Sequence, residues 1–196
     1  MDDGVDVAEV GQPVEEAAVL GGLRKRKDTG RRAHRHEGGL VVEDRDGTVV
    51  LPYATTQVFT GDAWDEVGSD PLKGKAEWTF VRRGARWTTG SIDRSSPLAV
   101  LCRAATDAST AVRLAIVRQR LAGGDTVDFD RISATAHELW VHGHRPLPWA
   151  EIERLAFPAL EPVALETVSR GRFTVADKAA QIADLAVLIA LIDNGR

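Results

Sequence analysis

The sequence contains one cysteine, one methionine and one tyrosine among 196 residues. A lone cysteine, Cys102, excludes an intramolecular disulfide and a four-cysteine zinc site, and this usage is typical of a reducing cytoplasm. Long hydrophobic runs are also lacking. The longest, residues 182–192, is interrupted by Asp184 and has about half of the roughly 20 residues that cross a bilayer. We therefore expect a cytoplasmic protein without a membrane-spanning helix.

The beginning of the chain lacks the positive start and the apolar core of a secretory signal. Residues 1–23 instead carry six acids and no base. The formal net charge of the whole chain is -4, which argues against binding of nucleic acid through bulk charge. Hydrophobic residues make up 43% of the sequence, enough for a folded, globular protein.

Motifs of catalytic or cofactor sites are also lacking. The sequence contains no Gly-x-Ser-x-Gly elbow, no phosphate-binding glycine loop and no His-Glu-x-x-His pair. Cys102 stands in an apolar stretch without an adjacent base, which is typical of a buried, unreactive cysteine. Paired acids such as Asp128 and Asp130 are expected on the outward side of a strand. The sequence therefore predicts no catalytic residue, no cofactor and no metal ion.

An internal repeat organises what is present. The motif Leu-Pro-aromatic-Ala occurs at residues 51–54 and again at residues 147–150, which is 147 − 51 = 96 residues later. In both places an apolar strand and a tight turn precede the motif, and another apolar strand follows it. The shared order of elements favours duplication of one small unit.

Turn signals place several β-hairpins. Glycines at residues 37–39, the Asp-Gly pair at residues 46–47 and the turn at residues 83–85 each separate two β-rich runs. Residues 61–75 are polar and contain glycine, aspartate and proline, so we expect a long loop there. Alternation of Val127 and Phe129 with acids predicts a half-buried strand.

Two kinds of helix signal follow these strands. Ser96 before Pro97 predicts a helix start, and Asp107 or Ser109 predicts the cap of a second helix that ends at Gly123-Gly124. A capping box at residues 174–177 predicts the start of the last helix. Its apolar stripe consists of Ile182, Leu185, Ile189 and Ile192.

The order of short strands and a closing helix resembles the pleckstrin-homology-like (PH-like) fold. The residues EGGLV (37–41), LAGGDTVDF (121–129), LPWAEI (147–152) and the helix that closes at Ile192 resemble an uncharacterised family of actinobacterial proteins with such units. The resemblance implies an α+β fold with two PH-like antiparallel β-barrel or sandwich units, each followed by a C-terminal amphipathic helix. The expected divisions are an acidic segment 1–23, a first unit 24–122 and a second unit 123–196.

A basic run is the strongest candidate for a binding surface. In a PH-like fold, a basic loop between the first strands can hold an anionic headgroup, and each base near an anionic surface contributes about 1 kcal/mol. A solvated loop balanced by the acidic segment, an anionic lipid surface, and an acidic protein or nucleic acid all fit this pattern. The basic residues are Arg24, Lys25, Arg26, Lys27, Arg31, Arg32 and Arg35.

Histidines and aromatic residues give weaker signals. The pairs His34/His36 and His142/His144 are expected at the surface, although four imidazoles could in principle bind a metal ion. Tyr53 and Trp149 occupy matching places in the two motifs and are expected in the cores. Trp64, within a polar loop, is either a core residue or an exposed anchor for a partner.

These observations favour a non-catalytic interaction module that binds a protein through a sheet edge, the Trp64 loop or the interface between units. The alternative is association with an anionic, phosphoinositide-type membrane surface through the basic loop 24–35. The identity of the partner and the oligomeric state are left open by the sequence.

Overall fold

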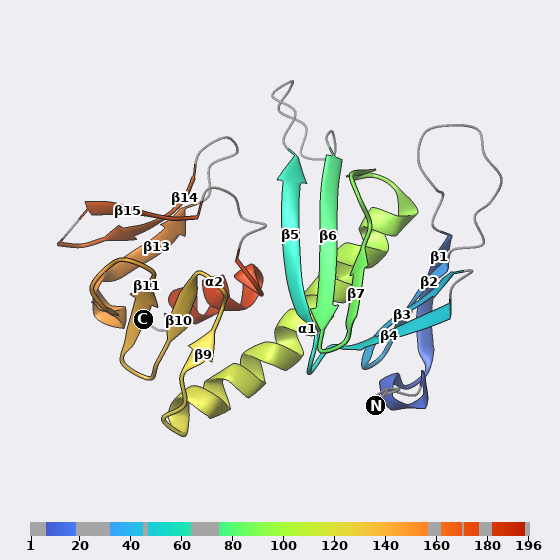
Figure 1. Cartoon of the computed structure of the whole chain (residues 1–196), viewed down its shortest axis with the longest axis horizontal. Coiled ribbons are helices and arrows are strands. Elements are labelled where there is room, and N and C mark those ends of the chain that lie inside the picture. Colours follow the sequence, from blue (N-terminus) through green and yellow to red (C-terminus); the bar gives the residue numbers. More distant parts are fainter. Residues whose placement is uncertain are drawn as a thin grey trace.

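The computed structural model describes residues 7–18, 32–44, 47–63, 75–156, 162–169, 171–176 and 182–194. Together these form a mixed α+β fold with four antiparallel sheets and two α-helices, and among the described residues none of the sheets closes into a barrel (Figure 1). The α+β class predicted from the sequence is therefore confirmed. The chain has a first half, which ends with α1, and a second half, which ends with α2.

The first half begins with a short 3₁₀ helix, η1 (Val7–Val10), followed by two sheets and a long helix. The first sheet has the order β1-β2-β3-β4 and the second the order β5-β6-β7, with β8 also paired to β6. The strands are β1 (Pro13–Ala18), β2 (Arg32–His36), β3 (Gly39–Asp44), β4 (Gly47–Pro52), β5 (Gln57–Ala63), β6 (Lys75–Arg82), β7 (Ala85–Thr88) and β8 (Ile92–Asp93). Helix α1 (Pro97–Ala122) follows them.

The second half has a similar order of elements, without a counterpart of β8 among the described residues. A four-stranded sheet, β12-β11-β10-β9, is followed by a three-stranded sheet, β13-β14-β15, and then by a helix. The strands are β9 (Val127–Asp128), β10 (Ile132–Ala134), β11 (Glu138–Val141), β12 (Leu147–Pro148), β13 (Ile152–Ala156), β14 (Val163–Thr167) and β15 (Gly171–Ala176). A 3₁₀ turn, η2 (Trp149–Glu151), precedes β13, and α2 (Leu185–Asn194) closes the chain.

The two Leu-Pro-aromatic-Ala motifs lie at corresponding places in these sheets. Leu51 of β4 lies opposite Leu40 of β3, and Leu147 of β12 lies opposite Leu139 of β11. The aromatic residue that follows then donates its backbone N–H to the residue just before the neighbouring strand. Tyr53 donates to the carbonyl of Gly38 over 2.9 Å, and Trp149 donates to the carbonyl of His137 over 3.2 Å. The same backbone connection is therefore made once in each half.

The hairpins predicted around residues 37–39 and 83–85 are confirmed, since β2 pairs with β3 and β6 with β7. At Gly39 the chains approach so closely that a Cβ atom would come within 2.8 Å of the carbonyl oxygen of Leu51. Glycine is required there because any side chain would push the strands apart. Strands β3 and β4 also pair, and Gly47 of the predicted turn begins β4, while Asp46 lies outside the described part.

The predicted loop 61–75 is shorter than expected at both ends. Residues 61–63 complete β5 and Lys75 begins β6, and the intervening residues lie outside the described part. The acidic segment 1–23 likewise supplies a strand, because its residues 13–18 form β1 and pair with β2.

The prediction of two helices between residues 96 and 122 was wrong. Ser96 caps a continuous helix, accepting a hydrogen bond from the Ala99 N–H over 3.2 Å, and the helix ends at Gly123 as predicted. Asp107 and Ser109 lie within it. The threonines of this stretch do not interrupt the helix, because their hydroxyls donate to carbonyls one turn back.

The start predicted for the last helix was also wrong. Residues 171–176 form strand β15, with Phe173 opposite Leu165 of β14, and α2 begins only at Leu185. The β-branched and aromatic residues Phe173, Thr174 and Val175 favour a strand over a helix. The capping-box pattern was therefore a false signal.

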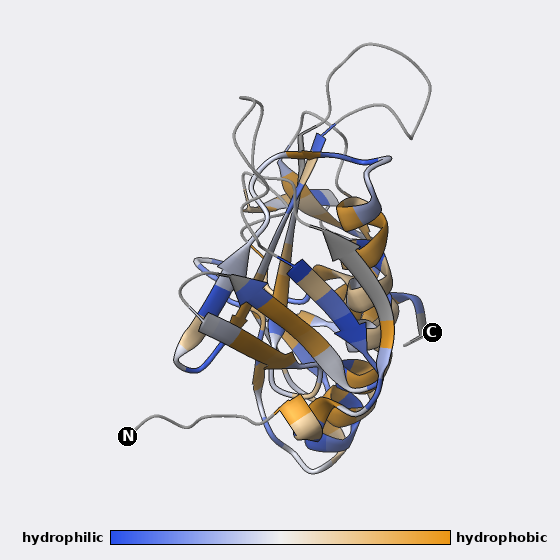
Figure 2. Ribbon diagram, turned by 90° about the vertical axis from the view of Figure 1, so that its right-hand side faces the viewer, coloured by the Kyte–Doolittle hydropathy of each residue, from blue (hydrophilic) through white to orange (hydrophobic). Residues whose placement is uncertain are grey.

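Each half has its own hydrophobic core, and α1 contributes to both (Figure 1). Its first turns, including Leu98 and Leu101, pack with the sheets of the first half. Its last turns, including Val117 and Leu121, pack with the second half and with α2. In Figure 2 the helices carry both apolar and polar residues, as expected for helices with one face on a core. Neither described helix has the length and hydropathy that a membrane span requires.

Candidate functional site

The basic run predicted as a binding surface lies mostly outside the described residues. Arg24, Lys25, Arg26, Lys27 and Arg31 belong to the connection between β1 and β2, as does the rest of residues 19–31. Arg32 and Arg35 are on β2, where Arg32 is exposed and lies opposite Glu43 of β3. The other predicted anchor, Trp64, also lies outside the described part. The structure therefore places two of these eight residues.

The first histidine pair differs from the prediction of surface positions. His36 is buried, with its Nδ1 atom 2.8 Å from the carbonyl oxygen of Gly11, because the segment after η1 covers the end of β2. His34 is half-buried, and its Nε2 atom lies 3.7 Å from a carboxylate oxygen of Glu43. Within the described ranges, no three His, Cys, Asp or Glu side chains gather as a metal site would require.

Cys102 lies in the core of the first half and is fully buried. Burial raises the pKa of its thiol, because the apolar surroundings disfavour the thiolate. A nucleophilic cysteine requires the opposite shift. Its role is therefore that of a small core residue, in agreement with the sequence.

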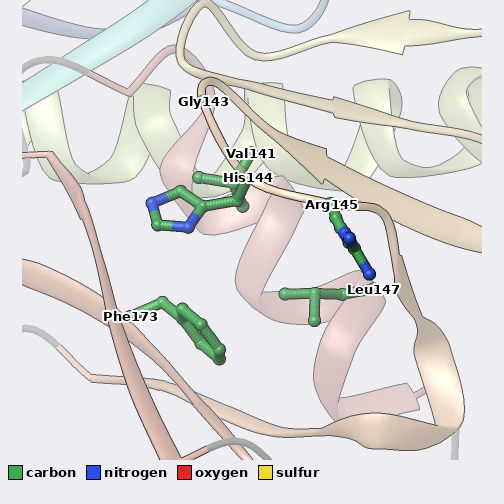
Figure 3. A pocket seen from close by; sticks show the side chains of 6 residues that line it. All are labelled: Val141, Gly143, His144, Arg145, Leu147 and Phe173. Atoms are coloured by element: carbon green, nitrogen blue, oxygen red, sulfur yellow. The ribbon is translucent and has the colours of Figure 1, made fainter.

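A pocket of about 310 Å³ lies in the second half, between the turn that joins β11 to β12 and strand β15 (Figure 3). Its volume is at the lower end of the range found for small-ligand sites. The lining residues are Val141, Gly143, His144, Arg145, Leu147 and Phe173. The pocket thus brings together residues from two different sheets.

Local geometry fixes the turn at the rim of this pocket. Gly143 has a φ of +80°, a conformation that glycine adopts without strain. The His144 N–H then donates to the carbonyl of Val141 over 2.9 Å, which closes the turn. This arrangement holds the side chains of His144 and Arg145 at the mouth, where both are exposed.

The pocket has an apolar floor and an aromatic wall. Val141 and Leu147 are buried, with exposed fractions of 3% and 1%. The ring of Phe173 meets that of His144 edge to face, with centroids 5.5 Å apart. Figure 3 shows these two rings on one side of the pocket, and Leu147 with Arg145 on the other.

Among the residues that the structure describes, the lining contains hydrogen-bond donors of basic character and no carboxylate. On the neighbouring strand, Glu166 lies opposite Arg172, and its carboxylate accepts a hydrogen bond from Arg154 Nε over 2.6 Å. Because successive side chains point to opposite faces of a sheet, Glu166 lies on the face opposite Phe173. The pocket is therefore suited to an anionic group that carries apolar surface.

Two other hollows in the described part are less suited to a ligand. One, of about 430 Å³, lies on β5, β6 and β7, where Glu77 and Arg86 are both in the lining. The other, of about 410 Å³, is a shallow groove beside Trp149 and the ends of both helices. The indole N–H of Trp149 already donates to the carbonyl of Thr135 over 3.0 Å.

A buried ion pair joins the two halves. Asp184, just before α2, accepts a hydrogen bond from Arg113 Nε of α1 over 2.7 Å and another from the Val58 N–H of β5 over 2.9 Å. The Asp184 N–H in turn donates to the Val58 carbonyl over 2.8 Å. Burial raises the pKa of this carboxyl, although Arg113 and the Val58 amide favour its charged form. Both charges are paired with each other, so this cluster serves the fold.

The sequence predicted the tight turn before the second Leu-Pro-aromatic-Ala motif, here residues 142–145, but not the pocket. His144 was identified only as a surface residue, and Arg145 and Phe173 were not singled out. Phe173 is 28 residues from Arg145, and only the packing of two sheets brings them together. A pattern within one segment cannot carry this information.

No protein-family model matches the chain, and neither a curated protein nor a solved structure matches it at a significant level.

Proposed function

We propose that the protein is a non-catalytic interaction module, made of two PH-like units, that binds a protein partner. The observation that carries this proposal is the pocket between the β11–β12 turn and β15. It offers an apolar floor, an aromatic wall and two exposed basic side chains, which are the groups that recognise part of a peptide. The buried Cys102 fits a protein of the reducing cytoplasm.

The repeated order of elements supports the two-unit interpretation. In each half a four-stranded sheet is followed by a second sheet and then by a helix, and the backbone bonds of Tyr53 and Trp149 correspond. We propose that these halves are the two PH-like units. The first unit then begins with β1, earlier than residue 24, because β1 pairs with β2.

Peptide selection on the whole protein tests this function. A displayed library of random peptides is selected on the wild-type chain, and the binding of enriched peptides is compared between wild type and Arg145→Glu. We expect a shared motif whose binding is lost in Arg145→Glu. Arg83→Glu is the matched control, because Arg83 is exposed at the β6–β7 turn, away from the pocket. Failure to enrich any motif, or equal binding by both variants, contradicts the proposal.

The second candidate function is binding to an anionic membrane surface through the basic run 24–35. The position of residues 24–31 between the consecutive strands β1 and β2 favours it, since basic residues there are the pattern expected of a headgroup loop. Sedimentation with vesicles containing anionic lipid tests it. Binding should weaken as salt rises, because added salt screens these charges. Absence of salt-sensitive binding contradicts this alternative.

A further inference from the structure

We propose that the pocket binds the C-terminal residue of a partner protein, with the free carboxylate at His144 and Arg145 and an apolar side chain on the floor. This inference rests on the proposed protein-binding function and specifies the chemistry of the partner. Such an end carries an anion and an apolar group on one residue, a few ångströms apart.

The rim supplies the donors that a carboxylate requires. Arg145 presents a guanidinium, whose paired N–H groups match the two oxygens of a carboxylate. His144 lies beside it, held by the bond from its backbone N–H to Val141 and by the edge contact of its ring with Phe173. No acidic side chain in the described part of the lining competes for these donors.

The floor and wall define the rest of the occupant. Val141 and Leu147 are almost completely buried, and the ring of Phe173 lies across from Leu147 in Figure 3. These groups form no strong hydrogen bonds, so they favour a leucine, valine or phenylalanine side chain over a polar one. A volume of about 310 Å³ admits one or two residues and excludes a longer folded segment.

An acidic side chain within a peptide provides the same carboxylate but a different geometry. Its carboxylate is separated from the next apolar side chain by the peptide backbone, which continues in both directions. The turn that contains Gly143 lies on one side of the pocket, and β15, which carries Phe173, lies on the other (Figure 3). A chain that ends in the pocket has no continuing backbone to accommodate there, and we therefore favour the chain end.

Paired pools of hexapeptides test this inference. Each pool is randomised at its first five positions and has a fixed last residue, and each is made as the free acid and as the C-terminal amide. Binding to the full chain is followed by fluorescence polarisation. The free acids that end in Leu, Val or Phe should bind about tenfold or more tightly than their amides, because amidation removes the charge that Arg145 recognises. Their affinity should also exceed that of the free acids that end in Gly or Ser.

Two variants link this preference to the pocket. Arg145→Gln should abolish the difference between acid and amide, and Phe173→Leu should weaken the preference for an apolar last residue while leaving the fold intact. Arg83→Gln is the control and should change neither the difference between acid and amide nor the preference for an apolar last residue. Circular dichroism of each variant verifies that it is folded.

The outcomes separate this inference from the proposed function. If peptides bind and Arg145→Gln weakens them, but acid and amide bind equally, the chain-end inference is wrong and the protein-binding function stands. Inorganic phosphate and an acidic peptide are also tested as competitors. If phosphate displaces the free acids as effectively as the acidic peptide, and no last residue is preferred, the pocket is a general anion site and the inference is also wrong. If no pool binds and display also enriches no motif, the proposed function fails with it.

Discussion

Asp184 combines three features that are rare in one residue. It is a buried acid with 4% of its surface exposed, its φ is +48°, and its carboxylate bonds to groups from two distant elements. Aspartate is one of the few residues other than glycine that adopts this backbone conformation readily. The same residue interrupts the longest apolar run of the sequence, and that interruption marks the site of the contact between halves.

The raised pKa of Asp184 gives the stability a specific pH dependence. The folded protein binds this proton more tightly than the unfolded chain, so ionisation of Asp184 costs the folded state free energy. The contribution is fully present below the ordinary aspartate pKa of about 3.9 and is lost as pH rises through the folded-state value. We expect the unfolding free energy of wild type, minus that of Asp184→Asn, to fall as pH rises from acid to neutral.

Urea unfolding at a series of pH values measures this difference. Asp193→Asn is the control, because Asp193 is on α2 but exposed, and its difference from wild type should vary much less. A wild-type advantage that grows with pH would show that attraction to Arg113 outweighs burial, and would contradict the prediction.

At the scale of elements, the start of α1 depends on one side chain. Ser96 accepts the Ala99 N–H over 3.2 Å and Pro97 occupies the first turn, where its missing N–H is not needed. We expect Ser96→Ala to lower the unfolding free energy by about 1 kcal/mol, the usual contribution of such a cap. Ser95→Ala is the control, since the Ser95 hydroxyl donates to the exposed Asp93 side chain and caps no helix. If urea unfolding gives equal losses of unfolding free energy for Ser96→Ala and Ser95→Ala, Ser96 has no special role.

The sequence predicted elements well where the signal is local. Gly84, with a φ of +77°, marks the β6–β7 hairpin because a turn of this kind is formed by a few consecutive residues. The same holds for Ser96 at the start of α1 and for the glycines at its end. The pairing partners of the strands, and the contact of Phe173 with His144, depend on residues far apart in the chain.

The two errors in the helices have one physical origin, which is that local patterns do not reveal partners. Asp107 and Ser109 were interpreted as caps of a second helix, whereas α1 continues past them and its apolar residues pack first on one core and then on the other. At residues 174–177 a capping pattern coincided with a strand whose partner is β14. His36 was placed at the surface for the same reason, because its cover comes from the segment around Gly11.

At the scale of the whole molecule, the two cores are joined through α1 and through the Asp184 ion pair. Helix α1 contributes Leu98 and Leu101 to one core and Val117 and Leu121 to the other. Arg113, between these two groups, pairs with Asp184, which also binds the edge of β5 at Val58. Because α1 is continuous and packs in both cores, it fixes their relative position. The ion pair adds a second contact between the two halves.

This arrangement predicts that the halves unfold together only while the ion pair is intact. Removing the carboxylate of Asp184 leaves the partly buried guanidinium of Arg113 without its charged partner, which weakens the contact between the halves. Asp184→Gly removes the carboxylate, and glycine tolerates the φ of +48°. Hydrogen exchange read by mass spectrometry should give similar free energies for the most protected peptides of β6 and β14 in wild type. In Asp184→Gly the two values should separate, because each core then opens with its own stability.

Asp193→Gly, an exposed substitution on α2, serves as the control and should leave the two values together. Equal protection of β6 and β14 in Asp184→Gly would mean that α1 alone couples the halves.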